Sequence, residues 1–224
     1  FGPGSFNDLA TTPLPGKKAL IVITAGKSMR ANGYLDRLID MLGKQGIGHA
    51  LFDKILPNPV LRHVHEGAAL AREQGCDFVI GLGGGSSIDS AKSIAVMAKN
   101  PGDYWDYVSG GSGKGQPLVN GALPIVAVAT TAGTGTEADP WTVITKEDTN
   151  EKIGFGCAET FPVLSVVDPE MMLTIPAHLT AYQGFDAFFH AAEGFIANCS
   201  TPISDLYALE AIRLLAKYLP IAVS

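Results

Sequence analysis

Cysteine is scarce in this sequence, and the few that occur are far apart. Cys76, Cys157 and Cys199 are the only three among 224 residues, and no CxxC pair is present. A disulfide framework and a cysteine-based zinc site both need paired or clustered cysteines, so neither is expected. Unpaired thiols favour a reducing, cytoplasmic setting.

The chain also lacks an excess of positive charge and any long apolar run. Its 16 Lys and Arg against 22 Asp and Glu give a net charge of −6, which disfavours binding to nucleic acid or to an anionic membrane. The longest apolar runs, residues 19–23 and 123–129, are far shorter than the ~20 residues of a membrane helix. No signal-peptide pattern opens the sequence. The expected partner is therefore a small molecule.

What the sequence does contain is a regular alternation of buried strands and amphipathic helices. Apolar, β-rich segments predict strands at residues 17–24, 49–55, 77–82 and 124–130. Helical periodicity predicts helices at residues 33–45, 60–74 and 88–99. Because parallel neighbours need a long connection, this alternation predicts a Rossmann-like α/β domain with a parallel sheet and right-handed crossovers.

A helical part is expected to follow this domain. Short strands are predicted at residues 141–145, 152–157 and 163–167, after which helix formers dominate residues 177–198 and 202–218. We therefore expect an α/β dinucleotide-binding domain over residues 1–172 and a helical domain over residues 173–224.

A glycine-rich turn follows the third predicted strand. Residues 83–87 read GGGSS, at the point where a buried strand ends and a helix begins. Backbone N–H groups and the helix dipole favour a phosphate there, and glycines allow its close approach. Taken alone, the turn is equally consistent with a tight turn capped by a serine.

A threonine-rich loop follows the strand at residues 124–130. It reads TTAGTGTE over residues 130–137, again at the carboxyl end of a strand, where open α/β sheets bind their ligands. Two such loops after two buried parallel strands favour one shared nucleotide site over an ordinary polar loop.

Asp186 and His190 lie four residues apart, so both project from one face of a predicted helix. A carboxylate and an imidazole together suit a divalent ion such as iron or zinc. The spacing alone favours a solvated pair or a hydrogen-bonded histidine, but the apolar neighbours leave both side chains in need of partners. The other histidines lack such spacing, and we expect His63 and His65 at the surface.

Four motifs taken in order point to a family. PNP at residues 57–59, GGGSSIDSAK at 83–92, TTAGTGTE at 130–137 and GFDAFFHAAEGF at 184–195 together resemble the iron-containing (group III) alcohol dehydrogenases, whose fold is shared with dehydroquinate synthase. The resemblance implies a dinucleotide domain, an all-helical domain of which only the beginning is present, and an active site between them. It further implies NAD or NADP, a divalent metal, a small alcohol or aldehyde substrate and a homo-oligomer, a dimer or larger.

The resemblance also assigns residues. Gly84, Gly85 and Ser86 match the family's pyrophosphate loop, and Asp89 matches the acid in the following helix. Thr130, Thr131 and Thr134 match the second cofactor loop, and Lys152 matches a lysine near the cofactor ribose. Asp186 and His190 match the first two of four metal ligands, which would make them the catalytic metal centre.

Two departures from the family pattern affect the expected function. The other two metal ligands, both histidines, are absent, so the chain is either part of a longer protein or a form without dehydrogenase activity. The segment after the first strand, with Gly26 and Lys27, lacks the acid that favours NAD, which leaves NADP open. We expect a metal-dependent alcohol dehydrogenase, with iron or zinc. The alternatives are a zinc polyol dehydrogenase of the same fold and a nucleotide-binding fragment without catalysis.

Overall fold

The computed structural model describes all 224 residues, which form two compact units. The first unit comprises Phe1–Thr130 and Thr136–Glu170. The second comprises Thr131–Gly135 and Met171–Ser224. The threonine-rich loop is thus divided, because its middle residues group with the helices and its ends with the sheet.

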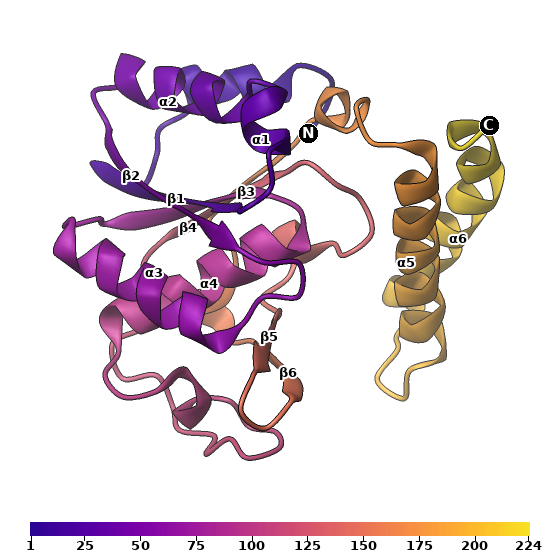
Figure 1. Ribbon diagram of the computed structural model, residues 1–224. Helices are drawn as coiled ribbons and strands as arrows, with labels where there is room; N and C mark the ends of the chain where they lie inside the picture. Colours follow the sequence, from indigo (N-terminus) through magenta and orange to yellow (C-terminus); the bar gives the residue numbers. More distant parts are fainter. The chain divides into compact units, whose positions relative to one another are not determined.

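A parallel sheet of five strands forms the centre of the first unit (Figure 1). Its strands are β1 (Lys18–Thr24), β2 (Gly48–Ile55), β3 (Phe78–Gly83), β4 (Ile125–Ala129) and β7 (Leu164–Val167). Their order is β2-β1-β3-β4-β7, and every pair is parallel. The predicted Rossmann-like α/β fold is therefore confirmed.

Helices cover both faces of this sheet (Figure 1). On one face lie α2 (Tyr34–Lys44) and the short α1 (Ser28–Ala31), with the 3-10 segment η1 (Ser5–Ala10) beside α2. On the other face lie α3 (Leu61–Glu73) and α4 (Gly85–Lys99). This division follows from right-handed crossovers. The connection from β1 to β2 runs toward one edge of the sheet, whereas the connections from β2 to β3 and from β3 to β4 run toward the other edge. Their helices therefore lie on opposite faces.

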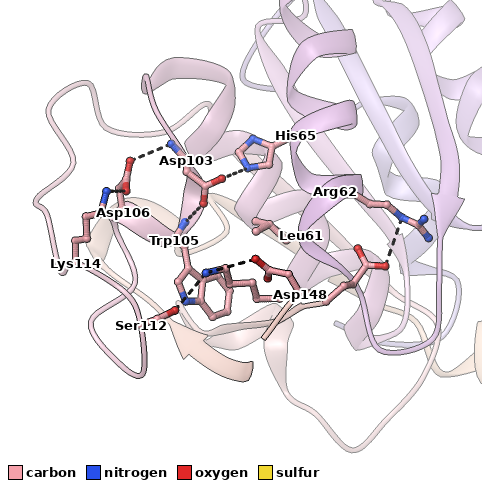
Figure 2. Close-up of a pocket in the computed structure, with 11 residues that line it drawn as sticks. Leu61, Arg62, His65, Asp103, Trp105, Asp106, Ser112, Lys114 and Asp148 are labelled. Atoms are coloured by element: carbon pink, nitrogen blue, oxygen red, sulfur yellow. Dashed lines mark hydrogen bonds and ion pairs between the residues drawn. The ribbon is translucent and has the colours of Figure 1, made fainter. Parts of the chain in front are cut away.

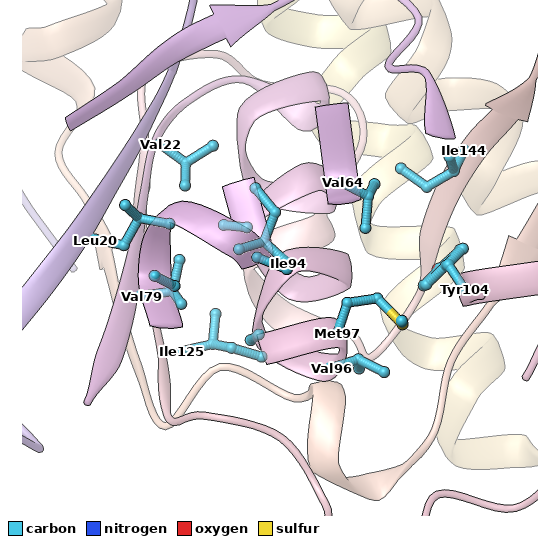
Figure 3. Packing of buried hydrophobic residues seen from close by; sticks show 14 of the residues in the cluster. Leu20, Val22, Val64, Val79, Ile94, Val96, Met97, Tyr104, Ile125 and Ile144 are labelled. Atoms are coloured by element: carbon cyan, nitrogen blue, oxygen red, sulfur yellow. The ribbon is translucent and has the colours of Figure 1, made fainter. Parts of the chain in front are cut away.

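The main core lies between the sheet and α3 with α4 (Figure 3). Leu20, Val22 and Val79 of the strands are fully buried, and they belong to the same cluster as Val64 of α3 and Ile94 of α4. Strands buried on both faces read as continuous apolar runs, which is why they could be found in the sequence.

Two expectations about local structure were wrong. Helix α4 begins at Gly85, three residues earlier than the predicted Ile88, so part of the glycine-rich turn is its first turn. His63 is buried, not exposed, because its ring packs edge-on against Phe52, and this burial lowers its pKa. The short strands predicted at residues 141–145 and 152–157 are present as β5 (Thr142–Lys146) and β6 (Glu151–Phe155), which form a separate antiparallel sheet.

The second unit contains a hairpin of two long helices, α5 (Ala177–Ile196) and α6 (Pro202–Ala222) (Figure 1). Thr201 starts α6 through a capping box with Ser204, and Pro202 occupies the first turn, where its missing N–H is not needed. A side chain at Gly184 would overlap Leu219, so glycine permits the close approach of the two helices.

Four single-turn 3-10 segments complete the list of elements: η2 (Tyr104–Asp106), η3 (Thr136–Ala138), η4 (Ala158–Thr160) and η5 (Pro169–Met172). None of the helices is long and apolar enough to span a membrane. All three cysteines are free thiols.

Candidate functional site

The carboxyl ends of three neighbouring strands bring the predicted cofactor segments of the first unit together. Gly83 at the end of β3 is paired with Ala129 at the end of β4, and the Thr130 N–H donates to the Gly83 carbonyl at 2.9 Å. The connection after β1 leads to one face of the sheet and that after β3 leads to the other. In open α/β sheets, such a divergence between adjacent strands opens the crevice in which ligands bind.

The glycine-rich turn has the shape of a phosphate cradle. Gly83 has φ +147°, and a Cβ there would lie 2.5 Å from the Ser87 hydroxyl oxygen, so only glycine fits. Gly84 precedes the first turn of α4, and no side chain caps that turn. The Ser87 hydroxyl is buried without a hydrogen-bond partner. Uncapped N–H groups at the start of a 15-residue helix, beside an unpartnered hydroxyl, fit a pyrophosphate.

Gly85 and Ser86, predicted in the same cradle, form the first turn of α4 and are partly exposed. Thr130 is buried at the neighbouring strand end. These predicted residues thus lie at two neighbouring strand ends, and their assignment to the cofactor stays a prediction.

Asp89, one turn further along α4, faces the interior of the unit. One carboxylate oxygen accepts from the Thr136 hydroxyl at 2.7 Å and the other from the Val143 N–H at 3.0 Å. Burial raises the pKa of Asp89, and these two hydrogen bonds oppose the rise. Because both oxygens already have protein partners, Asp89 holds the segments beyond β4, and its assignment to the cofactor stays a prediction.

Lys92 is a residue of this region that the sequence did not single out. It is fully buried, and its ammonium donates to the carbonyls of Thr136, Asp139 and Trp141 at 2.6–2.8 Å. The Asp139 carboxylate lies 3.2 Å away. Burial lowers the pKa of Lys92, and Asp139 opposes that change. The sequence did contain a signal for a buried lysine, because Lys92 lies between Ala91 and Ser93 in a segment of small and apolar residues.

Lys152 and the PNP segment come together in the first unit. The Lys152 ammonium is exposed and donates to the Asn58 side-chain oxygen at 2.8 Å. Asn58 itself has φ +57°, in the left-handed region that asparagine tolerates. The PNP segment and Lys152, 94 residues apart in sequence, are thus connected by one hydrogen bond.

In the second unit, the middle of the threonine-rich loop contacts the Asp186–His190 pair. The ring Nδ1 of His190 lies 3.2 Å from the Gly133 carbonyl, and a Cβ at Gly133 would lie 2.8 Å from an Asp186 carboxylate oxygen. Gln183, which the sequence did not assign to this contact, accepts from the Ala132 N–H at 3.0 Å. Thr131 and Thr134 belong to the same stretch.

This geometry fits half of a metal site. A carbonyl oxygen can only accept, so Nδ1 of His190 is the donor in this contact. In the neutral ring, Nε2 then has the lone pair that a metal would need. Nε2 lies 4.0 Å from an Asp186 carboxylate oxygen, and both side chains are about half exposed. No group of three or more His, Cys, Asp or Glu residues is arranged to hold a metal. Asp186 and His190 are therefore two residues that could hold a metal only together with further ligands.

A separate cavity lies elsewhere in the first unit, and its charges compensate one another. It measures about 580 Å³ and lies between the start of α3 and the loop around η2 (Figure 2). His65 pairs with Asp103 at 3.1 Å, and Lys114 pairs with Asp106 at 2.7 Å. Arg62 pairs with Glu147 and Lys146 with Asp148, so the charged side chains that line this cavity are paired with one another.

Comparison with known proteins identifies the family of this chain. Residues 1–169 match the family described as iron-containing alcohol dehydrogenase, and residues 180–224 match the C-terminal part of the Fe-containing alcohol dehydrogenase family. The chain belongs to the iron-containing alcohol dehydrogenase family. This confirms the resemblance that the four motifs indicated.

Relatives within this family have diverse alcohol substrates. The chain is 36% identical to the NAD-dependent methanol dehydrogenase of Bacillus methanolicus, in a match that covers 100% of this chain and 57% of the relative. It is 37% identical to the 1,3-propanediol dehydrogenase of Klebsiella pneumoniae, with the same coverage. The crystal structure of the NADH-dependent butanol dehydrogenase A of Thermotoga maritima superposes with a TM-score of 0.89 at 35% identity, covering 98% of this chain and 54% of that one. The chain thus spans little more than half the length of these relatives.

Proposed function

We propose that this chain carries the cofactor domain and part of the metal site of an alcohol dehydrogenase. The reaction is the reversible transfer of hydride between a small primary alcohol or its aldehyde and NAD(P), assisted by a divalent metal, iron in preference to zinc. Residues 1–172 would form the dinucleotide domain and residues 173–224 the start of the helical metal-binding domain. Membership of the family supports this proposal.

The observation that carries the proposal is the contact between Gly133 and the Asp186–His190 pair. A ligand histidine whose second nitrogen is held by a backbone carbonyl has a fixed tautomer and ring orientation. The carbonyl comes from Gly133, within the loop predicted to hold the cofactor. One loop would therefore hold both the reacting end of the cofactor and the orientation of a metal ligand.

The remaining residues would bind and position the cofactor. Gly84, Gly85 and Ser86 would receive the pyrophosphate, Thr130 with Thr131 and Thr134 would form the second loop, and Lys152 would lie near a ribose. Asp89 would act through Thr136, by fixing the end of the threonine-rich loop. When bound, the metal supplies Lewis acidity toward the alcohol oxygen and the nicotinamide accepts the hydride.

The substrate class is supported by the names of the relatives. Methanol, 1,3-propanediol, choline and 4-hydroxybutyrate are the alcohols named for four of them. All four carry a primary hydroxyl group. A small primary alcohol is the substrate class that they share.

The first prediction tests the metal ligands. Replacing Asp186 with Ala in the full-length protein removes a charged ligand, so metal content should fall to a small fraction of the wild-type value, and oxidation of NAD(P)H by short aldehydes should fall with it. Elemental analysis of the purified protein measures the metal. Glu193→Ala is the matched control, because Glu193 is an exposed acid on the same helix. Unchanged metal content in Asp186→Ala would refute the ligand assignment.

A further inference from the structure

We infer that Gln183 is a positioning residue for the metal centre, because it holds the stretch Ala132–Gly133, whose carbonyl orients His190. This inference rests on the proposed function, and it adds a residue that acts on a metal ligand without being a ligand itself. Three features of the second unit support it: the place of Gln183 on α5, its contact with the threonine-rich loop, and the exposure of His190.

Gln183, Asp186 and His190 lie on one face of α5. They occupy positions i, i+3 and i+7 of the helix, and such positions project from the same side. The middle of the threonine-rich loop packs against this face, because a Cβ at Gly133 would lie 2.8 Å from an Asp186 carboxylate oxygen and 3.0 Å from the Gln183 carbonyl oxygen. Gly133 also has φ +106°, so only glycine suits both its backbone and this close packing. The loop therefore lies directly on the helix face that carries the two predicted metal ligands.

Side chains of α5 bind two consecutive residues of this loop. The Ala132 N–H donates to the Gln183 side-chain oxygen at 3.0 Å, and the Gly133 carbonyl accepts from Nδ1 of His190 at 3.2 Å. A backbone N–H can only donate, so it is the oxygen of the Gln183 amide that faces the loop. Because the two bonded groups belong to neighbouring residues, a displacement at Ala132 also moves the Gly133 carbonyl. The direction of that carbonyl thus depends on Gln183.

His190 needs this carbonyl because packing restrains its ring little, as its side chain is 53% exposed. Gln183, in contrast, is partly buried and lines a cavity of about 320 Å³ in the second unit. Other residues of that cavity wall are apolar, among them Leu214, Tyr218 and Leu219. An amide turned toward these side chains would be left without a hydrogen bond, so its contact with the loop is favoured. Gln183 therefore anchors the loop, and the loop orients the histidine.

The test measures the affinity of the full-length protein for metal, without turnover, by isothermal titration of the metal-free protein with Zn²⁺. Gln183→Met keeps the length of the side chain but removes the acceptor oxygen. Zn²⁺ should then bind about fivefold more weakly, a smaller loss than the roughly 10- to 100-fold typical of a residue that contacts a ligand directly. Gln183→Glu keeps an acceptor oxygen and should bind Zn²⁺ at least as tightly as the wild type. Gln74→Met is the matched control, because Gln74 is an exposed glutamine at the end of α3 in the first unit.

A spectroscopic measurement separates positioning from a general loss of structure. The visible absorption of Co²⁺ depends on the arrangement of its ligands, so the spectrum of the Co²⁺-loaded protein should change in Gln183→Met and stay the same in Gln183→Glu. The urea midpoint of the metal-free variants should match that of the wild type, because the hydrogen bond that is lost is exposed to solvent. A lower midpoint with an unchanged Co²⁺ spectrum would assign Gln183 a purely structural role and overturn the inference.

The remaining outcomes distinguish this inference from the proposed function. Wild-type Zn²⁺ affinity and a wild-type Co²⁺ spectrum in Gln183→Met would overturn the inference and leave the proposed function standing. An equal loss of affinity in Gln183→Glu would overturn it as well, since the acceptor oxygen would then not matter. A wild-type protein that binds neither Zn²⁺ nor Co²⁺ would instead count against the proposed function itself.

Discussion

Asp168, directly after β7, binds the N-terminal segment of the chain through hydrogen bonds. It is almost fully buried after β7, and its carboxylate accepts from the N–H groups of Gly4, Phe6 and Glu170 at 3.0–3.1 Å. Burial alone would raise the pKa of Asp168, but these three hydrogen bonds, with the nearby Arg37, outweigh it and lower the pKa. The charged carboxylate is therefore the form that stabilises the fold.

The residue-scale prediction concerns pH. A carboxyl whose pKa is lowered by folding stabilises the protein above its ordinary pKa of about 3.9, and this contribution is lost as the pH falls through the lower folded value. Asp168→Asn should reduce the free energy of unfolding at pH 7 by about 2 kcal/mol. Its stability should also change less than that of the wild type between pH 5 and pH 3.

Urea unfolding at several pH values measures both effects of this substitution. Asp40→Asn is the control, because Asp40 is an exposed acid on α2. Parallel pH profiles for the wild type and Asp168→Asn would show that Asp168 contributes no charge-dependent stability.

At the scale of elements, α4 connects the phosphate cradle to the segment that follows the threonine-rich loop. Its first turn forms the phosphate cradle, while Lys92, two turns later, holds the segment from Thr136 to Trp141 through three carbonyls. The Thr136 hydroxyl and the Asp139 carboxylate also lie within hydrogen-bond distance of this ammonium, at 2.7 and 3.2 Å, so its three N–H donors are fully used. Movement of α4 and of the end of the threonine-rich loop is therefore coupled.

The element-scale prediction removes this connection. Lys92→Met keeps the apolar stem but leaves three carbonyls of a partly buried segment without their donor, so stability should fall by about 3 kcal/mol. Amides between Thr136 and Trp141 should exchange with solvent faster, and cofactor affinity should fall. Lys99→Met, at an exposed position of the same helix, is the control. Unchanged hydrogen exchange in Lys92→Met would contradict the role of Lys92 in holding this segment.

The elements also show how much the sequence could predict. Strands β1 to β4 and helices α2 and α3 were found within one or two residues, because each is an apolar run or an amphipathic period bounded by Gly or Pro. The start of α4 was missed because glycine and serine are weak helix formers. Its position is fixed instead by packing, since a Cβ at Gly81 would lie 2.9 Å from the Ile88 Cα atom.

The candidate site divides in the same way. A spacing of four residues was enough to place Asp186 and His190 on one helical face. The Gly133 carbonyl lies 57 residues away from His190 in sequence, and no local pattern predicts such a contact. The hydrogen bond between Lys152 and Asn58, 94 residues apart, likewise has no local sequence signal.

At the scale of the whole molecule, the two units differ in how they bury apolar surface. The first unit encloses its sheet between helices, whereas the α5–α6 hairpin leaves seven large side chains more than 60% exposed: Tyr182, Phe189, Ile196, Ile203, Leu206, Tyr207 and Ile221. Large apolar patches on soluble monomers are rare, and they mark contact surfaces where they occur. The matched relatives are longer than this chain, with only 57% of the methanol dehydrogenase covered.

The last prediction follows from this exposed surface. The 224-residue polypeptide, produced alone, should self-associate through the α5–α6 hairpin, so its mass in solution should rise with concentration and it should bind an apolar dye. Light scattering coupled to size exclusion measures the mass.

Leu206→Lys combined with Tyr207→Lys should shift the polypeptide toward monomer, since two charges on the contact surface repel and must be desolvated. Val119→Lys is the matched control, because Val119 is equally exposed but lies in a loop of the first unit. A concentration-independent monomer mass for the unmodified polypeptide would show that this hairpin needs no partner.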